Sequence, residues 1–242
     1  MGMEKERFLI GKAAKYLGVS IGTLRLWDAS GKLSAKKTES GYRFYLKADL
    51  DFFKEDLYAL ARAWAASAQP GMLPEDLYAD IAPRFQARQA SMAQIMERQQ
   101  NFSIETVSLL IAVVGEIGDN AFTHNIGNWP DQPGIFFGYD LGKREVMIAD
   151  RGQGIYATLK RVAPEMQNDK DALQVALTKF ISGRAPEKRG NGLKFVREVV
   201  IDNDFTLEIQ SGLAIARITK DSGMHIETAR ENIRGTIAKI TF

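Results

Sequence analysis

Three polar residues recur at intervals of four within an otherwise apolar stretch. Glu116, Asn120 and His124 follow the sequence VSLLIAVV, which occupies residues 107–114. Residues four apart share one face of an α-helix, so a carboxylate, an amide and an imidazole would line up on the same side. Burying such groups is unfavourable unless they line a site. The spacing therefore predicts a functional site on a buried helix over residues 103–125.

Two glycine-rich elements follow this helix. Asp150 ends the sequence EVMIAD and begins a D-x-G-x-G pattern that contains Gly152 and Gly154. Further along, Gly190 and Gly192 form the sequence RGNGL at the start of an expected helix. Free backbone N–H groups and the helix dipole at such a position favour phosphate. Each element alone is common, whereas their order and spacing are more specific.

The elements that would position these residues combine strands and helices. Period-two alternation predicts strands over 134–140 and 145–150, helical periodicity predicts helices over 171–181 and 193–200, and the polar stretch 182–192 is expected to be a loop. The sequences FTLEIQ, LAIARIT and GTIAKITF are expected as closing strands. The chain is therefore expected to have an α+β fold.

Together the three elements resemble the GHKL superfamily of ATPases and kinases over about residues 103–242. The resemblance implies a Bergerat-type α/β sandwich, with a mixed sheet covered by helices on one face. It also implies that Asn120 coordinates Mg²⁺, which bridges the phosphates of ATP. Asp150 would accept a hydrogen bond from the adenine amino group.

The resemblance assigns the remaining nucleotide contacts as well. The two glycines after Asp150 would let the backbone approach the nucleotide, and loop 182–192 would cover the triphosphate. Thr236, which follows Gly235, would lie near adenine. The implied nucleotide-binding residues are Asn120, Asp150, Gly152, Gly154, Lys188, Arg189, Gly190, Gly192 and Thr236. The charges of the loop are equally compatible with a solvated surface run.

Glu116 distinguishes between possible reactions. In the hydrolytic and serine-kinase branches of the superfamily, a glutamate at this position is the general base. Histidine kinases instead phosphorylate a histidine on a preceding helix, and residues 52–100 contain no histidine. Self-phosphorylation by that route is therefore excluded. ATP hydrolysis, transfer to a hydroxyl of a partner protein, and nucleotide binding without turnover stay open.

The amino-terminal segment has a different character. Residues 1–50 contain ten Lys and Arg against five Asp and Glu, a net charge of +5, whereas the remainder carries −3. The patterns over residues 8–53 predict two short helices, the second capped by Ser20, then a hairpin turning at 39–41. This charge asymmetry favours a part of the chain that faces nucleic acid.

The sequences VSIGTLR and SGYRFY in this segment resemble the MerR-type winged helix-turn-helix over about residues 8–53. The resemblance implies DNA contacts from Ser20, Thr23, Arg25, Tyr42 and Arg43. The pair Leu26-Trp27 replaces the two tyrosines common in metal- and drug-sensing members, so their promoter-twisting mechanism is not implied. A protein-interaction module is the alternative for this segment.

Composition limits the remaining possibilities. The chain of 242 residues has no cysteine and two histidines, which excludes disulfides, thiolate metal sites and His-rich zinc sites. It lacks an apolar run of about eighteen residues, so a cytoplasmic protein without a membrane span is expected. Pro70-Gly71 separates two helical patterns, which cover residues 50–68 and 74–99.

We therefore expect three parts: a DNA-binding domain over 1–53, a helical linker and dimerisation region over 54–100, and an ATP-binding domain over 101–242. Expected partners are DNA, a second copy of the chain and a possible protein substrate. The sequence favours a regulator whose DNA affinity changes with its Mg-ATP state. A serine/threonine protein kinase resembling the anti-sigma kinases is the alternative.

Overall fold

The computed structural model describes residues 6–17, 20–29, 33–54, 57–70, 73–99, 101–179 and 192–242. Contacts divide the chain into two units, Met1–Leu60 and Ala61–Phe242. Each unit has its own hydrophobic core.

The first unit is a small winged helix. It contains β1 (Arg7–Leu9), α1 (Ile10–Leu17), α2 (Ile21–Ala29), β2 (Lys36–Lys37), β3 (Arg43–Leu46) and α3 (Lys47–Lys54). The three strands form an antiparallel sheet in the order β1-β3-β2. The expected pair of helices followed by a hairpin is confirmed, except that Phe8 lies in β1 because it pairs with Tyr45 of β3.

The second unit combines a sheet with helices. It contains residues 61–66 of α4 (Leu57–Ala66), η1 (Glu75–Leu77), β4 (Tyr78–Ala79), α5 (Ala82–Gln99), α6 (Ile104–Asn125), β5 (Ile135–Asp140), β6 (Glu145–Asp150), α7 (Gly154–Leu159), α8 (Asp169–Thr178), α9 (Gly192–Asp202), β7 (Thr206–Thr219) and β8 (Gly223–Thr241). The five strands follow the order β4-β5-β6-β8-β7. Every described strand pair is antiparallel. The expected mixed sheet is therefore wrong, because β5–β6 and β7–β8 are hairpins.

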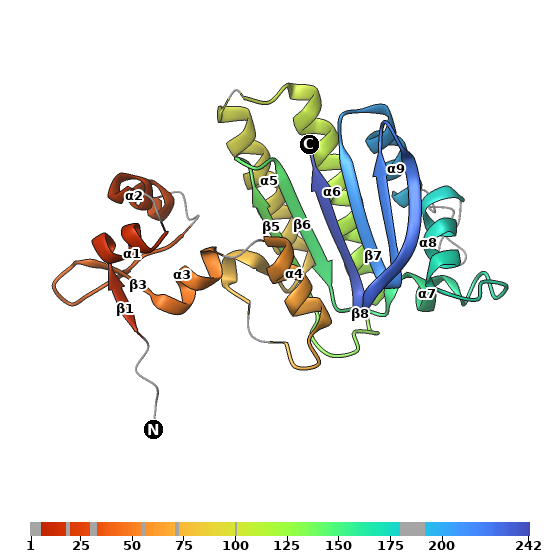
Figure 1. The fold of residues 1–242 in the computed structure, drawn as a ribbon, viewed down its shortest axis with the longest axis horizontal. Coiled ribbons are helices and arrows are strands. Elements are labelled where there is room, and N and C mark those ends of the chain that lie inside the picture. Colours follow the sequence, from red (N-terminus) through yellow and green to blue (C-terminus); the bar gives the residue numbers. More distant parts are fainter. Residues whose placement is uncertain are drawn as a thin grey trace. The chain divides into compact units, whose positions relative to one another are not determined.

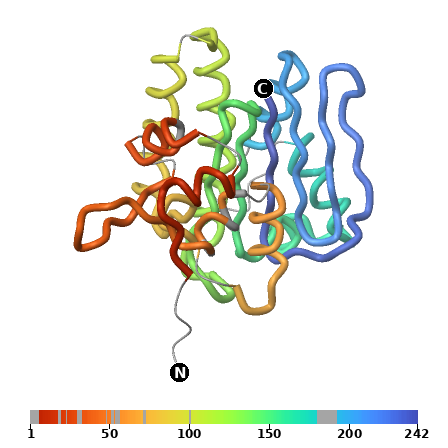
Figure 2. The backbone as a smooth tube through the Cα atoms, turned by 60° about the vertical axis from the view of Figure 1, so that its left-hand side comes forward, coloured from red at the N-terminus to blue at the C-terminus, as the bar shows by residue number. Residues whose placement is uncertain are grey.

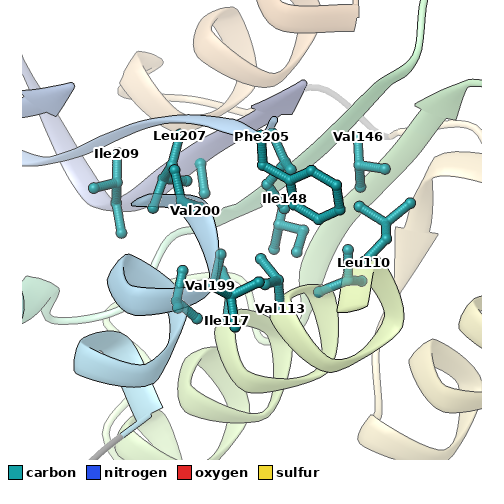
Figure 3. Packing of buried hydrophobic residues seen from close by; sticks show 14 of the residues in the cluster. Leu110, Val113, Ile117, Val146, Ile148, Val199, Val200, Phe205, Leu207 and Ile209 are labelled. Carbon is teal, nitrogen blue, oxygen red and sulfur yellow. The ribbon is translucent and has the colours of Figure 1, made fainter. Parts of the chain in front are cut away.

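Helices α5, α6 and α9 cover one face of this sheet (Figure 1). Val146 and Ile148 alternate along β6 and contribute to the core between sheet and helices, together with Val113 of α6 and Val199 of α9 (Figure 3). By length and composition α6 is apolar enough to cross a membrane, but most of its apolar residues pack in this core. The Ser103 hydroxyl caps it by accepting a hydrogen bond from the Thr106 N–H.

Two segments differ from the sequence-based expectation. The sequences FTLEIQ and LAIARIT, expected as two strands, contribute to one long strand, β7, which begins at Thr206 and has an irregularity at Ser211 and Gly212. Its backbone runs beside that of β8 (Figure 2). In the expected linker region, Phe85, Met92 and Met96 of α5 are fully buried in the core of the second unit. Helix α5 is thus an integral part of that unit.

The approach of α5 to α6 predicts the effect of a small substitution. A Cβ atom at Gly118 would lie 2.2 Å from Cζ of Phe85, a fully buried ring. We expect Gly118→Ala to lower the free energy of unfolding by about 1–3 kcal/mol, because the packed core must shift. Urea denaturation measures this change. Gly115→Ala is the control, since its Cβ would meet only the end of the flexible Gln89 side chain at 3.1 Å; equal effects would contradict the packing argument.

Candidate functional site

The polar residues of α6 form a row beside the apolar stripe that packs in the core. The helix is continuous from Ile104 to Asn125, so Glu116, Asn120 and His124 share one face. Glu116 is exposed, and the other two are half-buried. They form a polar row that leaves the apolar stripe of the helix free to pack in the core.

The start of α9 lies against this row. A Cβ atom at Gly192 would be 2.4 Å from Oε2 of Glu116 and 3.1 Å from Nδ2 of Asn120. The main chain at the start of α9 therefore lies close to the carboxylate of Glu116 and the amide of Asn120. Gly192 lies 76 and 72 positions after Glu116 and Asn120 in the sequence, and it meets them at the positive end of a helix dipole.

Asp150 lies at the end of β6 and faces the same side of the sheet as Val146 and Ile148, by the alternation of the strand. Its side chain is buried. The Gly152 N–H donates a hydrogen bond to Oδ1 at 2.7 Å. Thr236 binds the same carboxylate through its backbone N–H and its side chain. The D-x-G-x-G turn and the end of β8 thus meet at one acidic group.

Burial raises the pKa of Asp150 to about 7, although the hydrogen bonds from Gly152, Thr236 and Asn125 oppose this shift. A carboxyl group with a pKa near 7 is partly protonated and partly ionised at neutral pH. Its protonation state therefore changes when a charged or hydrogen-bonding group approaches. A hydrogen-bond donor from a ligand would favour the ionised form. This group is therefore suited to recognising a donor in a water-poor environment.

Two glycines allow this close packing around Asp150. Gly235 has a φ of +77°, and a Cβ atom there would be 2.3 Å from the carbonyl oxygen of Asp150. A Cβ atom at Gly152 would be 2.0 Å from the amide nitrogen of Asn125. Both positions require glycine because the backbone itself contacts the neighbouring group.

Ser211 stabilises the turn at Gly154, the second glycine of the D-x-G-x-G pattern. Gly154 begins α7 with a φ of +79°. The Ser211 hydroxyl accepts a hydrogen bond from the Ile155 N–H at 2.9 Å and donates one to the Gly235 carbonyl at 3.1 Å. The turn before α7 is thereby fixed to strands β7 and β8.

Asn125 connects the polar row to Asp150, and the sequence analysis missed it. It is buried, its Oδ1 accepts a hydrogen bond from the Gln153 N–H at 2.9 Å, and its Nδ2 lies 3.5 Å from Oδ1 of Asp150. Asn120 precedes it by five residues, an axial rise of about 7.5 Å along a helix. Both asparagines belong to α6, which covers the face of the sheet to which Asp150 points. Asp150 and Asn120 therefore lie on the same side of the sheet. The available signal was a polar residue at the buried-face position four after Ala121.

Arg151 is the second residue that the sequence analysis missed. Its side chain is fully buried and donates hydrogen bonds to the carbonyl groups of Trp64, Ala65 and Ser67 and to the carboxylate of Asp131. The sequence offers no signal for this, because the residue occupies a variable position of the pattern and its partners are far away in the chain.

The structure does not describe every residue of the expected nucleotide-binding set. Lys188, Arg189 and Gly190, together with most of the expected loop 182–192, lie outside the described residues.

In the first unit, two of the residues expected to contact DNA are exposed, at the start of α2 and within it. Arg25 and Ser20 are exposed, and Thr23 lies within α2. Tyr42 is 69% exposed beside the turn at Gly41, which has a φ of +80°. The helix and the hairpin therefore present polar and aromatic groups to the outside.

Arg43, one of the expected DNA contacts, also forms an ion pair within the first unit. Its Nε donates to Oδ2 of Asp28 at 2.5 Å, and the Ala35 N–H donates to Oδ1 of the same residue at 2.8 Å. These two bonds, from Ala35 first and Arg43 second, hold the pKa of Asp28 below its usual value. The ion pair fastens the hairpin to the end of α2.

Comparison with known proteins agrees with this geometry. Residues 9–45 match the family described as MerR family regulatory protein. The chain is also 42% identical over 65 residues to the Type II methyltransferase M.Eco47II of Escherichia coli. That alignment covers 26% of this chain and 16% of the methyltransferase. The amino-terminal segment is thus a MerR-type helix-turn-helix domain, which supports a DNA-binding regulator.

Proposed function

We propose that this chain is a DNA-binding regulator whose second unit binds Mg-ATP and whose DNA affinity depends on the bound nucleotide. The MerR-type domain supports the DNA-binding part. The nucleotide part rests on the resemblance to the GHKL superfamily and on one structural observation. Gly192, the last residue of the G-N-G sequence, begins α9 beside the polar row of α6, where its Cβ position would be 2.4 Å from the Glu116 carboxylate and 3.1 Å from the Asn120 amide.

The residues present fit an adenine nucleotide and a magnesium ion. Asp150 offers a carboxylate acceptor for an amino group, and Asn120 offers an amide oxygen, a ligand type that suits Mg²⁺. The start of α9 offers N–H groups to a phosphate. Bound Mg²⁺ would neutralise charge on the phosphates. Glu116 is exposed beside that position, where it would accept a proton from an attacking water or hydroxyl.

Calorimetric titration with Mg-ATP, Mg-ADP and Mg-GTP tests the nucleotide site. We expect the two adenine nucleotides to bind and Mg-GTP to bind much more weakly. In Asn120→Ala, binding should lose its dependence on Mg²⁺, because the amide ligand is absent. Failure of all three nucleotides to bind the wild-type chain would overturn this part of the proposal.

Transfer of phosphate to a partner protein is the second candidate function, favoured by the exposure of Glu116. An exposed base is accessible to the hydroxyl group of another protein as well as to water. Incubation with labelled ATP and candidate partners separates the two, because a kinase leaves label on protein and an ATPase leaves free phosphate. Glu116→Gln should abolish either reaction while retaining nucleotide binding; a nucleotide sensor without turnover would show no reaction to lose.

The proposed DNA contacts predict different outcomes for two arginines. Arg25→Ala should weaken binding to a duplex selected by the wild-type chain by about tenfold or more, without changing thermal stability. Arg43→Ala should lower both, because Arg43 also pairs with Asp28. Fluorescence anisotropy and thermal denaturation measure the two effects. Arg98→Ala, an exposed residue of α5, is the charge-matched control; equal losses for Arg25 and Arg98 would contradict the assignment.

MerR-type regulators usually act as dimers, and we propose that this chain acts as a homodimer in the cytoplasm. A dimer would place two DNA-binding units on a two-fold-related site. Light scattering coupled to gel filtration measures the mass directly. A mass of one chain at micromolar concentration, with and without DNA, would contradict the dimer.

A further inference from the structure

Asp150 and Arg151 point to opposite sides of the sheet of the second unit. Asp150 faces α6, and its neighbour in the chain therefore faces the other side. Figure 1 draws α6 behind the sheet and the end of α4 in front of it. Arg151 is bound to that end of α4. One dipeptide thus joins the candidate nucleotide site to a helix on the opposite face.

The bonds of Arg151 cap the carboxyl-terminal end of α4. Nη1 donates to the carbonyl groups of Trp64 and Ala65, the latter at 3.1 Å, and Nη2 donates to that of Ser67 at 2.8 Å. The last carbonyl groups of a helix have no partner within it and carry the negative end of the helix dipole. A planar guanidinium can bind several of them at once. The end of α4 therefore depends on the position of Arg151.

Asp131 connects this cap to the backbone segment at Arg234 and Gly235, which lies beside Asp150. Its Oδ2 accepts a hydrogen bond from Arg151 at 2.6 Å and another from Arg234 at 2.9 Å. Burial alone would raise the pKa of Asp131, but hydrogen bonds from Arg151 and Gln132 outweigh it and hold that pKa below its usual value. Arg234 directly precedes Gly235, which contacts Asp150. Both backbone segments around Asp150 are therefore tied to one ion cluster.

We propose that Arg151 is a positioning residue that couples nucleotide binding at Asp150 to the order of the end of α4. This rests on the proposed function, because it requires a nucleotide at Asp150. Helix α4 begins at Leu57 in the first unit and ends at Ala66 in the second. A ligand that stabilises the turn at 150–154 would stabilise the cap and so the helix that leads to the DNA-binding unit. The coupling must be reciprocal.

Amide hydrogen exchange of the wild-type chain tests the coupling. With saturating Mg-ADP, we expect exchange of the amides of residues 63–67 to slow by about fivefold or more, the lower range of typical couplings. Titration of the same sample by calorimetry shows whether nucleotide binds. Binding without slower exchange at 63–67 would overturn the inference and leave the proposed function intact. Absence of binding would overturn the proposed function and the inference with it.

Variants test whether the coupling between nucleotide binding and the end of α4 depends on Arg151. Arg151→Lys and Asp131→Asn should each lose the nucleotide-dependent slowing, because a lysine lacks the planar fork and an asparagine lacks the charge. Glu231→Gln is the matched control, since the Arg62–Glu231 pair, 3.1 Å apart, also holds α4 to the sheet but does not touch residues 150–154. The slowing should persist in that variant. Persistence in Arg151→Lys, or its loss in Glu231→Gln, would overturn the role of Arg151.

Discussion

Replacing Asp150 with asparagine is expected to remove the preference of the chain for adenine over guanine nucleotides. The wild-type carboxylate would accept a hydrogen bond from the adenine amino group, and a charge-assisted bond of this kind is worth about 10- to 100-fold in affinity. The effect should be confined to the base. Mg-ATP should therefore bind Asp150→Asn about 10- to 100-fold more weakly, and Mg-GTP should be affected far less.

The pH dependence of binding gives a second readout of the same residue. Because the pKa of Asp150 is raised to about 7, the carboxyl group is mostly protonated at pH 6 and mostly ionised at pH 8. If only the ionised form accepts the amino group, affinity for Mg-ADP should rise about tenfold from pH 6 to pH 8. Asp150→Asn should lack this rise, whereas titration of the nucleotide phosphates is common to both proteins. A parallel rise in the variant would contradict the assignment.

Removal of Arg151 is expected to have the largest effect on stability. Arg151→Met should lower the free energy of unfolding by about 3–5 kcal/mol, because it leaves Asp131 partly buried without this partner and the end of α4 without its cap. Urea denaturation followed by circular dichroism measures the change. Arg217→Met is the control: Arg217 pairs with Glu208 and Glu227, but its side chain is 47% exposed. That variant should lose less than about 1 kcal/mol. Similar losses for the two variants would contradict the importance of the buried cluster.

Local patterns predicted the elements that carry the site. Helix α6 follows from its apolar sequence and from the cap at Ser103, and β5 and β6 follow from the alternation of apolar residues around a tight turn. The two-residue strand β4 could not be predicted, because it forms only by pairing Tyr78 and Ala79 with β5. Its sequence carries no strand signal of its own.

The sequence also revealed only one side of the candidate site. Spacing showed that Glu116 and Asn120 share a helix face, but their contact with Gly192 depends on packing between α6 and α9. Arg151 and its partner Ser67 are 84 residues apart and lie on the other face of the sheet. No periodicity reports such a contact, because it depends on where α4 ends in three dimensions.

We propose that nucleotide binding and DNA binding influence each other on one chain. The most direct measurement is the affinity for a selected duplex with and without saturating Mg-ATP, paired with the affinity for Mg-ATP with and without that duplex. We expect both affinities to change by the same factor, of about fivefold or more. Two affinities that stay unchanged, each ligand binding as if the other were absent, would contradict it.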